Sequence, residues 1–280
     1  MTVLKIFFLS ISVGNFLQKC VFAQTVPANT HTFDTRACQP PFNTYPFCNT
    51  ALSLDERVND LIERVWMTNQ SVIPQLLTAR NYGKNAIPSL GVPEYDYGLN
   101  AIHGVQSSCV LLADGVTVKC PTSFPNPINY GSAWNRSLIY DMGRIVGIES
   151  RALWLLGAVE QFPRNHIGLD CWSPNINIAR APQWGRNQEV SSEDTLLNGD
   201  FGQYYSMGLQ SPATGYAGYD PNHFLAIATL KHWDSYSLED SDGFTRHNFD
   251  AIVSNYSLST TYFPAFKQSI VQGGAKSVMC

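Results

Sequence analysis

Apolar side chains along this chain follow two alternating patterns, helical stripes and short continuous runs. The first stripe places four apolar side chains on one helix face: Val58, Leu61, Ile62 and Val65. Ser53 and Glu56 form a capping-box pattern at its start, in which each side chain accepts a hydrogen bond from the other residue's backbone N–H. The pattern therefore predicts a helix that begins just after Ser53.

Three later segments carry the same helical spacing, over residues 137–156, 196–209 and 262–271. The apolar face of the first consists of Ile139, Met142, Ile145, Val146 and Leu153. Short apolar runs between glycines or prolines predict strands in Ala86–Pro93, the start of Ile167–Asp194, Phe224–Leu230 and Lys276–Cys280. Tyr95–Gly104 and Thr122–Pro127 are predicted loops.

Strands and helices that alternate in this way indicate parallel βα units and an α/β fold. We favour a (β/α)8 TIM-barrel-like domain over residues 53–280, incomplete at its C-terminus, while the pattern alone leaves a doubly wound sheet open. The chain has no Gly-x-Gly-x-x-Gly or Walker loop of the kind that binds nucleotides. Residues 24–52, rich in Pro, Thr and Asn, are predicted to form an arm ahead of the domain.

A polar loop follows the strand in Ile167–Asp194, past the strand's carboxyl end, where parallel-sheet enzymes place ligand-binding groups. The loop residues of interest are Arg180, Pro182, Gln183, Trp184, Gly185 and Arg186. A helix is predicted to begin near Ser191 or Ser192. Glu193 and Asp194 would then lie in its first turn, at the positive end of the helix dipole.

The composition is that of a globular chain with a sizeable core, because 44% of its 280 residues are hydrophobic and only 14% are charged. The formal net charge is -4, and removal of Lys5 and Lys19 with a leader would leave 16 basic against 22 acidic residues, or -6. A mildly acidic chain without a basic run gives no electrostatic reason to expect a nucleic-acid partner.

The N-terminus has the pattern of a secretory signal peptide. Lys5 precedes an apolar run over residues 6–13, and small residues flank Phe22 in Val21–Ala23. Residues 1–23 are therefore predicted to be removed, and the mature chain to be secreted to the extracellular space. A buried N-terminal helix is the alternative interpretation. No later run approaches the roughly 20 apolar residues that a membrane span requires.

Loss of Cys20 with the signal peptide would leave six of the seven cysteines. Short separations in an oxidising compartment favour two local bridges among fifteen formal pairings. These bridges are Cys38 with Cys48 and Cys109 with Cys120. Cys171 and Cys280 lie in apolar runs, where a small buried thiol is the commoner interpretation.

Asparagine sequons offer three glycosylation sites, which are Asn69, Asn135 and Asn255. A zinc site is not expected, because the sequence has neither Cys-x-x-Cys nor His-x3-His spacing.

Several motifs occur in an order that resembles one enzyme family. The SPNINI, Pro-x-Trp-Gly-Arg and Glu-Asp motifs within residues 173–194 resemble the N-terminal domain of glycoside hydrolase family 3. Further matching motifs are Gly91–Val105, Thr122–Pro127, Lys231-His232 and Ser277–Cys280. The resemblance covers most of residues 50–280 and implies the barrel fold. It also implies hydrolysis of O-glycosyl bonds by a secreted, exo-acting beta-glucosidase or beta-xylosidase with a retaining mechanism and no cofactor.

The resemblance further implies sugar-binding residues. Arg186, Lys231 and His232 match positions that line the sugar pocket in the family, and Arg246 resembles a family arginine near that site. Charged groups suit this role because they form the stronger hydrogen bonds.

Each of these residues also has an interpretation that does not involve sugar. For Arg186 it is an ion pair with Glu189 or Glu193, and for Lys231-His232 it is a solvated strand end. Glu189, Glu193 and Asp194 are disfavoured as a catalytic pair, because acids at a helix start are more often caps or dipole partners.

Asn100 stands where the family usually carries a carboxylate that holds sugar hydroxyls. An amide still donates and accepts hydrogen bonds, but more weakly, and a loop-stabilising amide is the alternative. Asp96 is a nearby acid that would substitute for the carboxylate. His103-Gly104 is interpreted as a turn with a buried histidine.

Other departures concern the loop around Arg186. Ala181, Gln183 and Ser192 stand where the family commonly has Asp, Arg and Gly, which removes ion pairs expected to brace the loop. Trp172 and Trp184 are candidates to stack on sugar, although buried packing is the more frequent use of tryptophan.

A retaining glycosidase needs two carboxyl groups about 5 Å apart. By resemblance, the nucleophilic Asp is expected beyond Cys280, and the acid/base group in a later region, so we expect this sequence to be part of a longer enzyme. The alternative is a catalytically inactive, secreted carbohydrate-binding or interaction protein. The sequence separates neither glucose from xylose, which differ by one hydroxymethyl group, nor one oligomeric state from another.

Overall fold

The computed structural model describes residues 37–68, 70–76, 86–93, 97–106, 109–111, 114–155, 168–212 and 223–280. All of them belong to the unit Asp34–Cys280, one of two into which the chain divides. The predicted signal peptide, Asn69 and Asp96 lie outside the described residues.

The predicted first helix is present as α1 (Leu54–Thr68). Its capping box is confirmed, because Ser53 N donates to Glu56 Oε2 at 2.8 Å and Glu56 N donates to Ser53 Oγ at 3.3 Å. Val65 is buried, whereas Val58 and Ile62 of the predicted apolar face are 43% and 56% exposed. The neighbouring short helices are η2 (Phe42–Thr44), η3 (Pro46–Cys48), η4 (Gln70–Val72) and α2 (Ile73–Leu76).

The predicted strand Ala86–Pro93 is wrong. Ile87 and Val92 pair in an isolated antiparallel bridge around a 3-10 turn, η5 (Pro88–Leu90). Gly91 turns the chain back with φ +64°, a conformation that costs glycine little. The first strand of the main sheet comes later, at β1 (Gly98–Leu99), inside a predicted loop.

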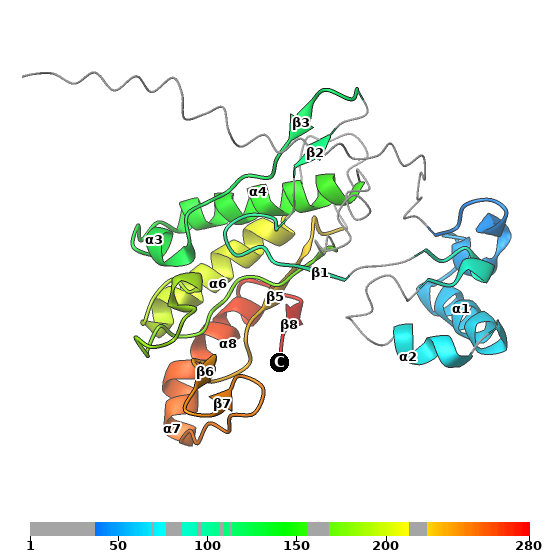
Figure 1. Cartoon of the computed structure of the whole chain (residues 1–280). Coiled ribbons are helices and arrows are strands. Elements are labelled where there is room, and N and C mark those ends of the chain that lie inside the picture. The colour runs from blue at the N-terminus through cyan, green and yellow to red at the C-terminus, as the bar shows by residue number, and fades with distance from the viewer. Residues whose placement is uncertain are drawn as a thin grey trace, which may run out of the picture. The chain divides into compact units, whose positions relative to one another are not determined.

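Four parallel strands form the main sheet in the order β1-β4-β5-β8 (Figure 1). The strands after β1 are β4 (Asp170–Cys171), β5 (Ile227–Leu230) and β8 (Ser277–Val278). Their register pairs Leu99 with Cys171, Cys171 with Ala228, and Leu230 with Val278. The remaining strands form two antiparallel hairpins, β2 (Val110–Leu111) with β3 (Val118–Lys119) and β6 (Asp240–Ser241) with β7 (Phe244–Thr245).

Helices α4 (Arg136–Leu155), α6 (Thr195–Gln210) and α8 (Phe263–Val271) match the three predicted helical segments and alternate with the strands, which confirms the α/β class (Figure 1). The predicted start of α6 at Ser191 or Ser192 is wrong. Asp194 is the N-cap, and its carboxylate accepts from Leu197 N at 2.8 Å. The short helical segments are α3 (Pro127–Gly131), η6 (Asn187–Glu189), α7 (Asn255–Ser257) and a π turn over Leu258–Tyr262.

Side chains alternate across the sheet, so each strand serves both the core and the opposite face. Ala228 and Leu230 of β5 are fully buried in the core with the helices. Thr229 and Lys231 alternate with them and line a cavity instead. Of the face predicted for α4, only Ile145 is exposed, at 38%.

Glycines allow α4 and α6 to approach closely. A Cβ at Gly147 would lie 2.4 Å from Leu209 O, and one at Gly208 would lie 2.1 Å from Tyr140 O. Both distances are too short for van der Waals contact with backbone, so the two helix backbones touch at these points.

Two disulfides match the predicted pairing, Cys38–Cys48 and Cys109–Cys120, with S–S distances of 2.01 Å and 2.03 Å. Cys171 is buried as predicted, but Cys280 is exposed. Within the described segments, none of the helices has the length and apolar character needed to cross a membrane.

Gly208→Ala is expected to lower the free energy of unfolding by about 1–3 kcal/mol through overpacking, despite the higher helix propensity of alanine. Urea unfolding measures the change. Gly185→Ala is the control, because its added Cβ would meet no atom within 4 Å. Equal stability of both variants would contradict the close helix contact.

Candidate functional site

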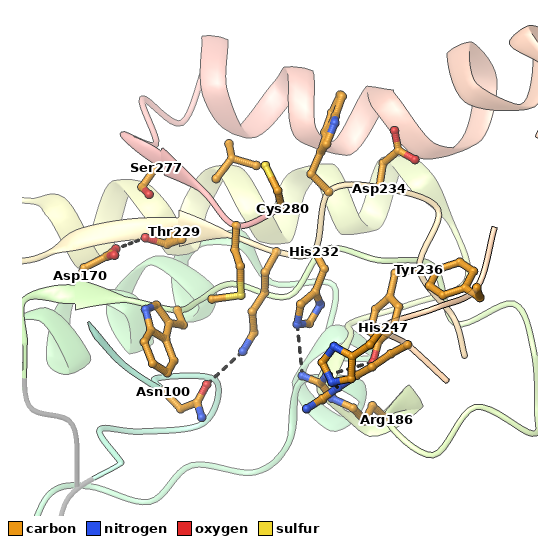
Figure 2. Close-up of a pocket in the computed structure, with 17 residues that line it drawn as sticks. Asn100, Asp170, Arg186, Thr229, His232, Asp234, Tyr236, His247, Ser277 and Cys280 are labelled. Carbon is orange, nitrogen blue, oxygen red and sulfur yellow. Dashed lines mark hydrogen bonds between the residues drawn. The ribbon is translucent and has the colours of Figure 1, made fainter. Parts of the chain in front are cut away.

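A cavity of about 620 Å³ lies at the carboxyl ends of the parallel strands (Figure 2). It brings together side chains that are as far apart in sequence as residues 100 and 280. All five residues expected to bind sugar line it: Asn100, Arg186, Lys231, His232 and Arg246.

Lys231 is buried at the end of β5, with 3% of its surface exposed. Its Nζ donates to Asn100 Oδ1 at 3.0 Å, which joins the ends of β1 and β5 (Figure 2). Burial lowers the pKa of Lys231 to about 8, against the attraction of the Glu189 carboxylate. An ammonium has three donors, so this one can serve a ligand as well as Asn100.

His232 is held by the amide of Asn177 through three contacts. Asn177 Oδ1 accepts from the His232 backbone N–H at 2.8 Å, and Asn177 Nδ2 donates to His232 O at 2.8 Å. These two bonds fix the orientation of the amide, so the contact of 3.0 Å between its Oδ1 and His232 Nδ1 requires the ring proton on Nδ1. Nε2 is then an acceptor.

The charge state of His232 agrees with this tautomer. Burial lowers its pKa to about 2, and the nearby Lys231, Arg186 and Arg246 cations add to the effect. The ring is therefore neutral across the physiological range.

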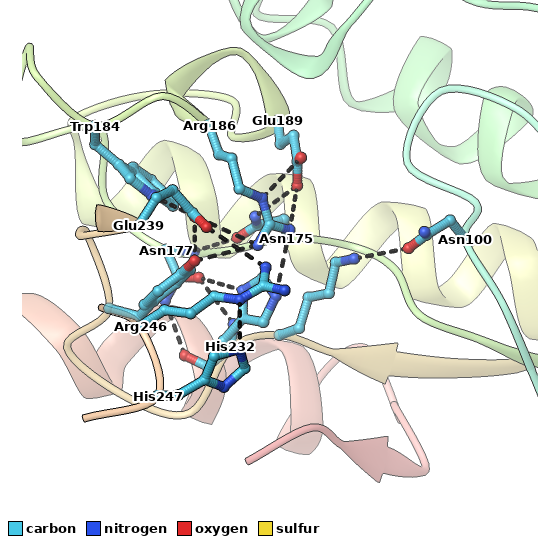
Figure 3. Close-up of polar contacts among 12 residues, drawn as sticks. Asn100, Asn175, Asn177, Trp184, Arg186, Glu189, His232, Glu239, Arg246 and His247 are labelled. Atoms are coloured by element: carbon cyan, nitrogen blue, oxygen red, sulfur yellow. Dashed lines mark hydrogen bonds and ion pairs between the residues drawn. The ribbon is translucent and has the colours of Figure 1, made fainter. Parts of the chain in front are cut away.

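Arg186 forms an ion pair with Glu189 (Figure 3), which was the expected alternative to sugar binding by this residue. Nε donates to Oε1 at 2.9 Å and Nη2 to Oε2 at 2.7 Å, a bidentate geometry. Burial acts against both charges, yet the pair outweighs it, so the pKa of Arg186 is raised and that of Glu189 is lowered. Arg186 Nη2 also lies 3.4 Å from His232 Nε2, and Nη1 donates to Tyr236 OH at 3.2 Å.

Asn175 and Asn177 support the cavity residues without lining the cavity, and the sequence interpretation missed them. Asn175 is fully buried, and its Nδ2 donates to Glu189 Oε2 at 3.3 Å. Asn177 N donates to Asn175 Oδ1 at 3.1 Å. The signal was present in SPNINI, where two asparagines alternate with Ile176 and Ile178, which are both buried.

Arg246 reaches the cavity from the end of the β6–β7 hairpin and is 47% exposed. Its Nη1 lies 3.4 Å from Glu239 Oε2, and its Nε donates to His247 Nε2 at 3.3 Å (Figure 3). Trp184 is buried, and its Nε1 donates to Glu239 Oε1 at 3.1 Å. Packing is therefore the observed use of Trp184, whereas Trp172 lines the cavity.

His103 is exposed, so the prediction of a buried histidine is wrong. The chain bends at His103-Gly104, where Gly104 has φ +128°, and Phe124 N donates to His103 O at 2.8 Å. His103 lines a second cavity of about 570 Å³, which also reaches Asn100 and Glu189.

The first cavity, at the strand ends, is also lined by Asp170, whose carboxylate accepts a hydrogen bond from Thr229. Burial raises the pKa of this carboxyl, and the Thr229 hydroxyl partly offsets the rise. Over the described segments, no group of three His, Cys, Asp or Glu side chains is arranged to hold a metal ion.

The sequence is similar to those of known proteins from one family. The Glycosyl hydrolase family 3 N terminal domain matches residues 112–280. A beta-xylosidase/alpha-L-arabinofuranosidase 2 of Medicago sativa is 36% identical over 244 residues, covering 87% of this chain and 29% of the relative. Probable beta-D-xylosidase 7 of Arabidopsis thaliana is 35% identical, with 86% and 30% covered. The chain thus spans about a third or less of these relatives.

Two solved structures are also similar to this chain. A GH3 exo-beta-xylosidase (XlnD) in complex with a xylobiose aziridine activity-based probe has a TM-score of 0.69 at 31% identity, covering 88% of this chain and 29% of that one. Beta-glucosidase 3B of Thermotoga neapolitana has a TM-score of 0.51 at 25% identity, with 69% and 23% covered. The α/β strands and helices described above are thus those of a TIM-barrel-like domain, as predicted.

The low pKa of His232 predicts an acid-sensitive fold. Below pH 6.5 the unfolded state protonates this histidine while the folded state does not, until the pH nears 2. Stability therefore falls as pH falls, by up to about 1.4 kcal/mol per pH unit. His232→Gln should show a correspondingly flatter decline in urea unfolding between pH 6 and pH 4.

The control is His103→Gln, which replaces an exposed histidine. It should keep the wild-type slope. A His232→Gln slope equal to that of the wild type would show that His232 is protonated in the folded state.

Proposed function

The chain belongs to glycosyl hydrolase family 3, and on that premise we propose that it carries the sugar-binding part of an exo-acting glycosidase. The observation that supports this most is the convergence of Asn100, Lys231 and His232 on one cavity. Asn100 directly follows β1, and Lys231 and His232 directly follow β5; strand ends of this kind are where barrel enzymes bind substrate.

The polar groups suit the vicinal hydroxyls of a pyranose. Lys231 offers N–H donors beyond its bond to Asn100, and His232 offers Nε2 as an acceptor, whose contact with Arg186 Nη2 is a long one of 3.4 Å. Arg246, which also lines the cavity, adds a further cation. Nη1 of Arg186, with contacts of 3.2 Å and 3.5 Å, is the more weakly held nitrogen of that guanidinium and is the donor we assign to a sugar hydroxyl.

We propose a beta-linked xyloside or glucoside as substrate. Several similar proteins are named xylosidases, and the solved structure of one holds a xylobiose-derived probe. The proposed mechanism is retaining, with the nucleophile and the acid/base supplied outside these 280 residues. Glu189 and Glu239 are engaged by arginines, and Asp170 is engaged by Thr229, so none of the three is a poised catalytic carboxylate.

A second candidate is a secreted carbohydrate-binding protein without catalysis. The observation that favours it is Asn100, an amide at the position where the family resemblance implies a carboxylate. Its Oδ1 is occupied by Lys231, so the amide serves the protein as well as a ligand.

We also propose that the protein is exported and glycosylated. The two disulfides are typical of an oxidising compartment. Asn135 and Asn255 of the predicted glycosylation sites are both exposed. Cleavage after Ala23 would release the mature chain.

Lys231→Met is expected to weaken xylose binding by about 10- to 100-fold, because a charge-assisted hydrogen bond contributes about 1.5–3 kcal/mol. Isothermal titration with xylose and with glucose measures the affinity. Lys267→Met, which removes an exposed lysine of α8, should leave it unchanged. A wild-type chain that binds neither sugar would overturn the proposal, and hydrolysis of an aryl beta-xyloside would contradict the placement of the catalytic groups.

Asn100→Asp is expected to tighten sugar binding by about 5-fold, because a carboxylate forms stronger bonds to hydroxyls and to Lys231 than an amide does. The added negative charge should also raise the pKa of Lys231. The same titration, repeated at pH 7 and pH 9, measures both effects. Unchanged affinity would place Asn100 outside the sugar contact.

A further inference from the structure

Glu239 does not line the cavity, but it contacts two arginines that do, and no motif or expected sugar contact accounts for it. It precedes the β6–β7 hairpin, and its side chain is 29% exposed. We propose that Glu239 is a positioning residue that holds Arg186 and Arg246 at the cavity wall. The proposal rests on the proposed sugar-binding function of that cavity.

One oxygen of the Glu239 carboxylate gathers three donors. Oε1 accepts from Tyr236 OH and, at 3.1 Å, from Trp184 Nε1. Arg186 Nη1 lies 3.5 Å from the same oxygen. The oxygen therefore ties the Arg186 loop to the segment after His232, 55 residues away in sequence.

The other oxygen faces the hairpin. Oε2 lies 3.4 Å from Arg246 Nη1, and the backbone joins the same two residues because Arg246 N donates to Glu239 O at 2.9 Å (Figure 3). Arg246 thus has a backbone and a side-chain link to one residue. These links place its guanidinium beside the cavity rather than in open solvent.

Charge balance gives the same assignment. Arg186, Arg246 and Lys231 line one cavity, and their mutual repulsion has to be offset by nearby anions. Of the two arginines, Glu189 contacts Arg186, through two bonds. Glu239 is the carboxylate that contacts both arginines.

Aromatic packing supports the position of this carboxylate. Tyr236 lies edge-on to Trp184, with ring centroids 5.4 Å apart, and edge-on to His232, with centroids 4.8 Å apart. The hydroxyl that Tyr236 donates to Glu239 is therefore on a ring that already touches the site histidine. Removal of the carboxylate would leave the Trp184 and Tyr236 donors without their acceptor.

The test compares Glu239→Gln with the wild type by xylose titration, alone and combined with Arg246→Ala. We expect the single variant to weaken binding by about 5- to 10-fold. In the Arg246→Ala background the same change should weaken it less, by about 2- to 3-fold, because Glu239 then acts through Arg186 alone. Glu239→Asp, which keeps the charge, should recover part of the lost affinity.

A readout that does not use sugar separates this proposal from the proposed function. Phenylglyoxal modification of Arg246, followed by peptide mass spectrometry, should be several-fold faster in Glu239→Gln than in the wild type. Asp240→Asn removes an equal charge from the next residue, which is exposed, and should change neither the affinity nor the modification rate.

The outcomes are distinct. If the wild type binds xylose and Glu239→Gln binds equally well, Glu239 is not a positioning residue. Equal losses with and without Arg246 would overturn positioning through Arg246. If the wild type binds no sugar, the proposed function fails, and the modification rate alone decides whether Glu239 restrains Arg246. Should Glu239→Gln not fold, Glu239→Asp supplies the same comparison.

Discussion

Two cations, the buried Lys231 and the half-buried Arg186, line one cavity at the end of the sheet, and the surrounding structure is arranged to tolerate them. An unpaired charge in the interior costs several kcal/mol even after relaxation. Glu189 therefore holds Arg186 in a bidentate pair, and Asn100 supplies the lysine with an acceptor. Each cation is thus held in place by a partner from the protein.

The fold supplies the positions that this arrangement needs. Parallel strands end at one edge, and alternation along β5 sends Leu230 to the core and Lys231 to the cavity. Close contact of α4 with α6 through Gly147 and Gly208 holds the helical layer behind the sheet. Asn177 then fixes the ring of His232 from the neighbouring segment. Helix packing, strand register and the histidine tautomer thus together determine the geometry of the cavity residues.

The loop around Arg186 shows how lost ion pairs are replaced. Ala181 and Gln183 remove charged partners that the family resemblance implies. Backbone groups serve instead, because Ala181 O accepts from Asn187 Nδ2 at 2.7 Å and from Trp184 N at 3.0 Å. Arg180 Nε donates to Ser237 Oγ at 3.0 Å and ties the loop to the segment after His232. Backbone carbonyls and a serine hydroxyl thus hold the loop, together with the ion pair of Arg186 and Glu189.

Local patterns in the sequence were sufficient for the helices, because capping and apolar spacing act within a few residues. Ser53 with Glu56 began α1 as predicted, and α4, α6 and α8 match their stripes. The strands were harder, since runs as short as Gly98–Leu99 have too few residues to show a period. The apolar run around Pro88 and Gly91 resembled a strand, but these two residues form a turn there.

The residues in and around the cavity also fall into two groups, those found from sequence motifs and those found from the tertiary structure. Sequence motifs identified Asn100, Arg186, Lys231, His232 and Arg246, and the cavity contains all five. The roles of Asn175, Asn177 and Glu239 depended on tertiary structure, because each acts on a partner that is brought near only by the fold. Glu239 meets Trp184 across 55 residues, and Asn177 meets His232 across the same separation. Sequence determines which groups are available, and the parallel sheet decides which of them meet.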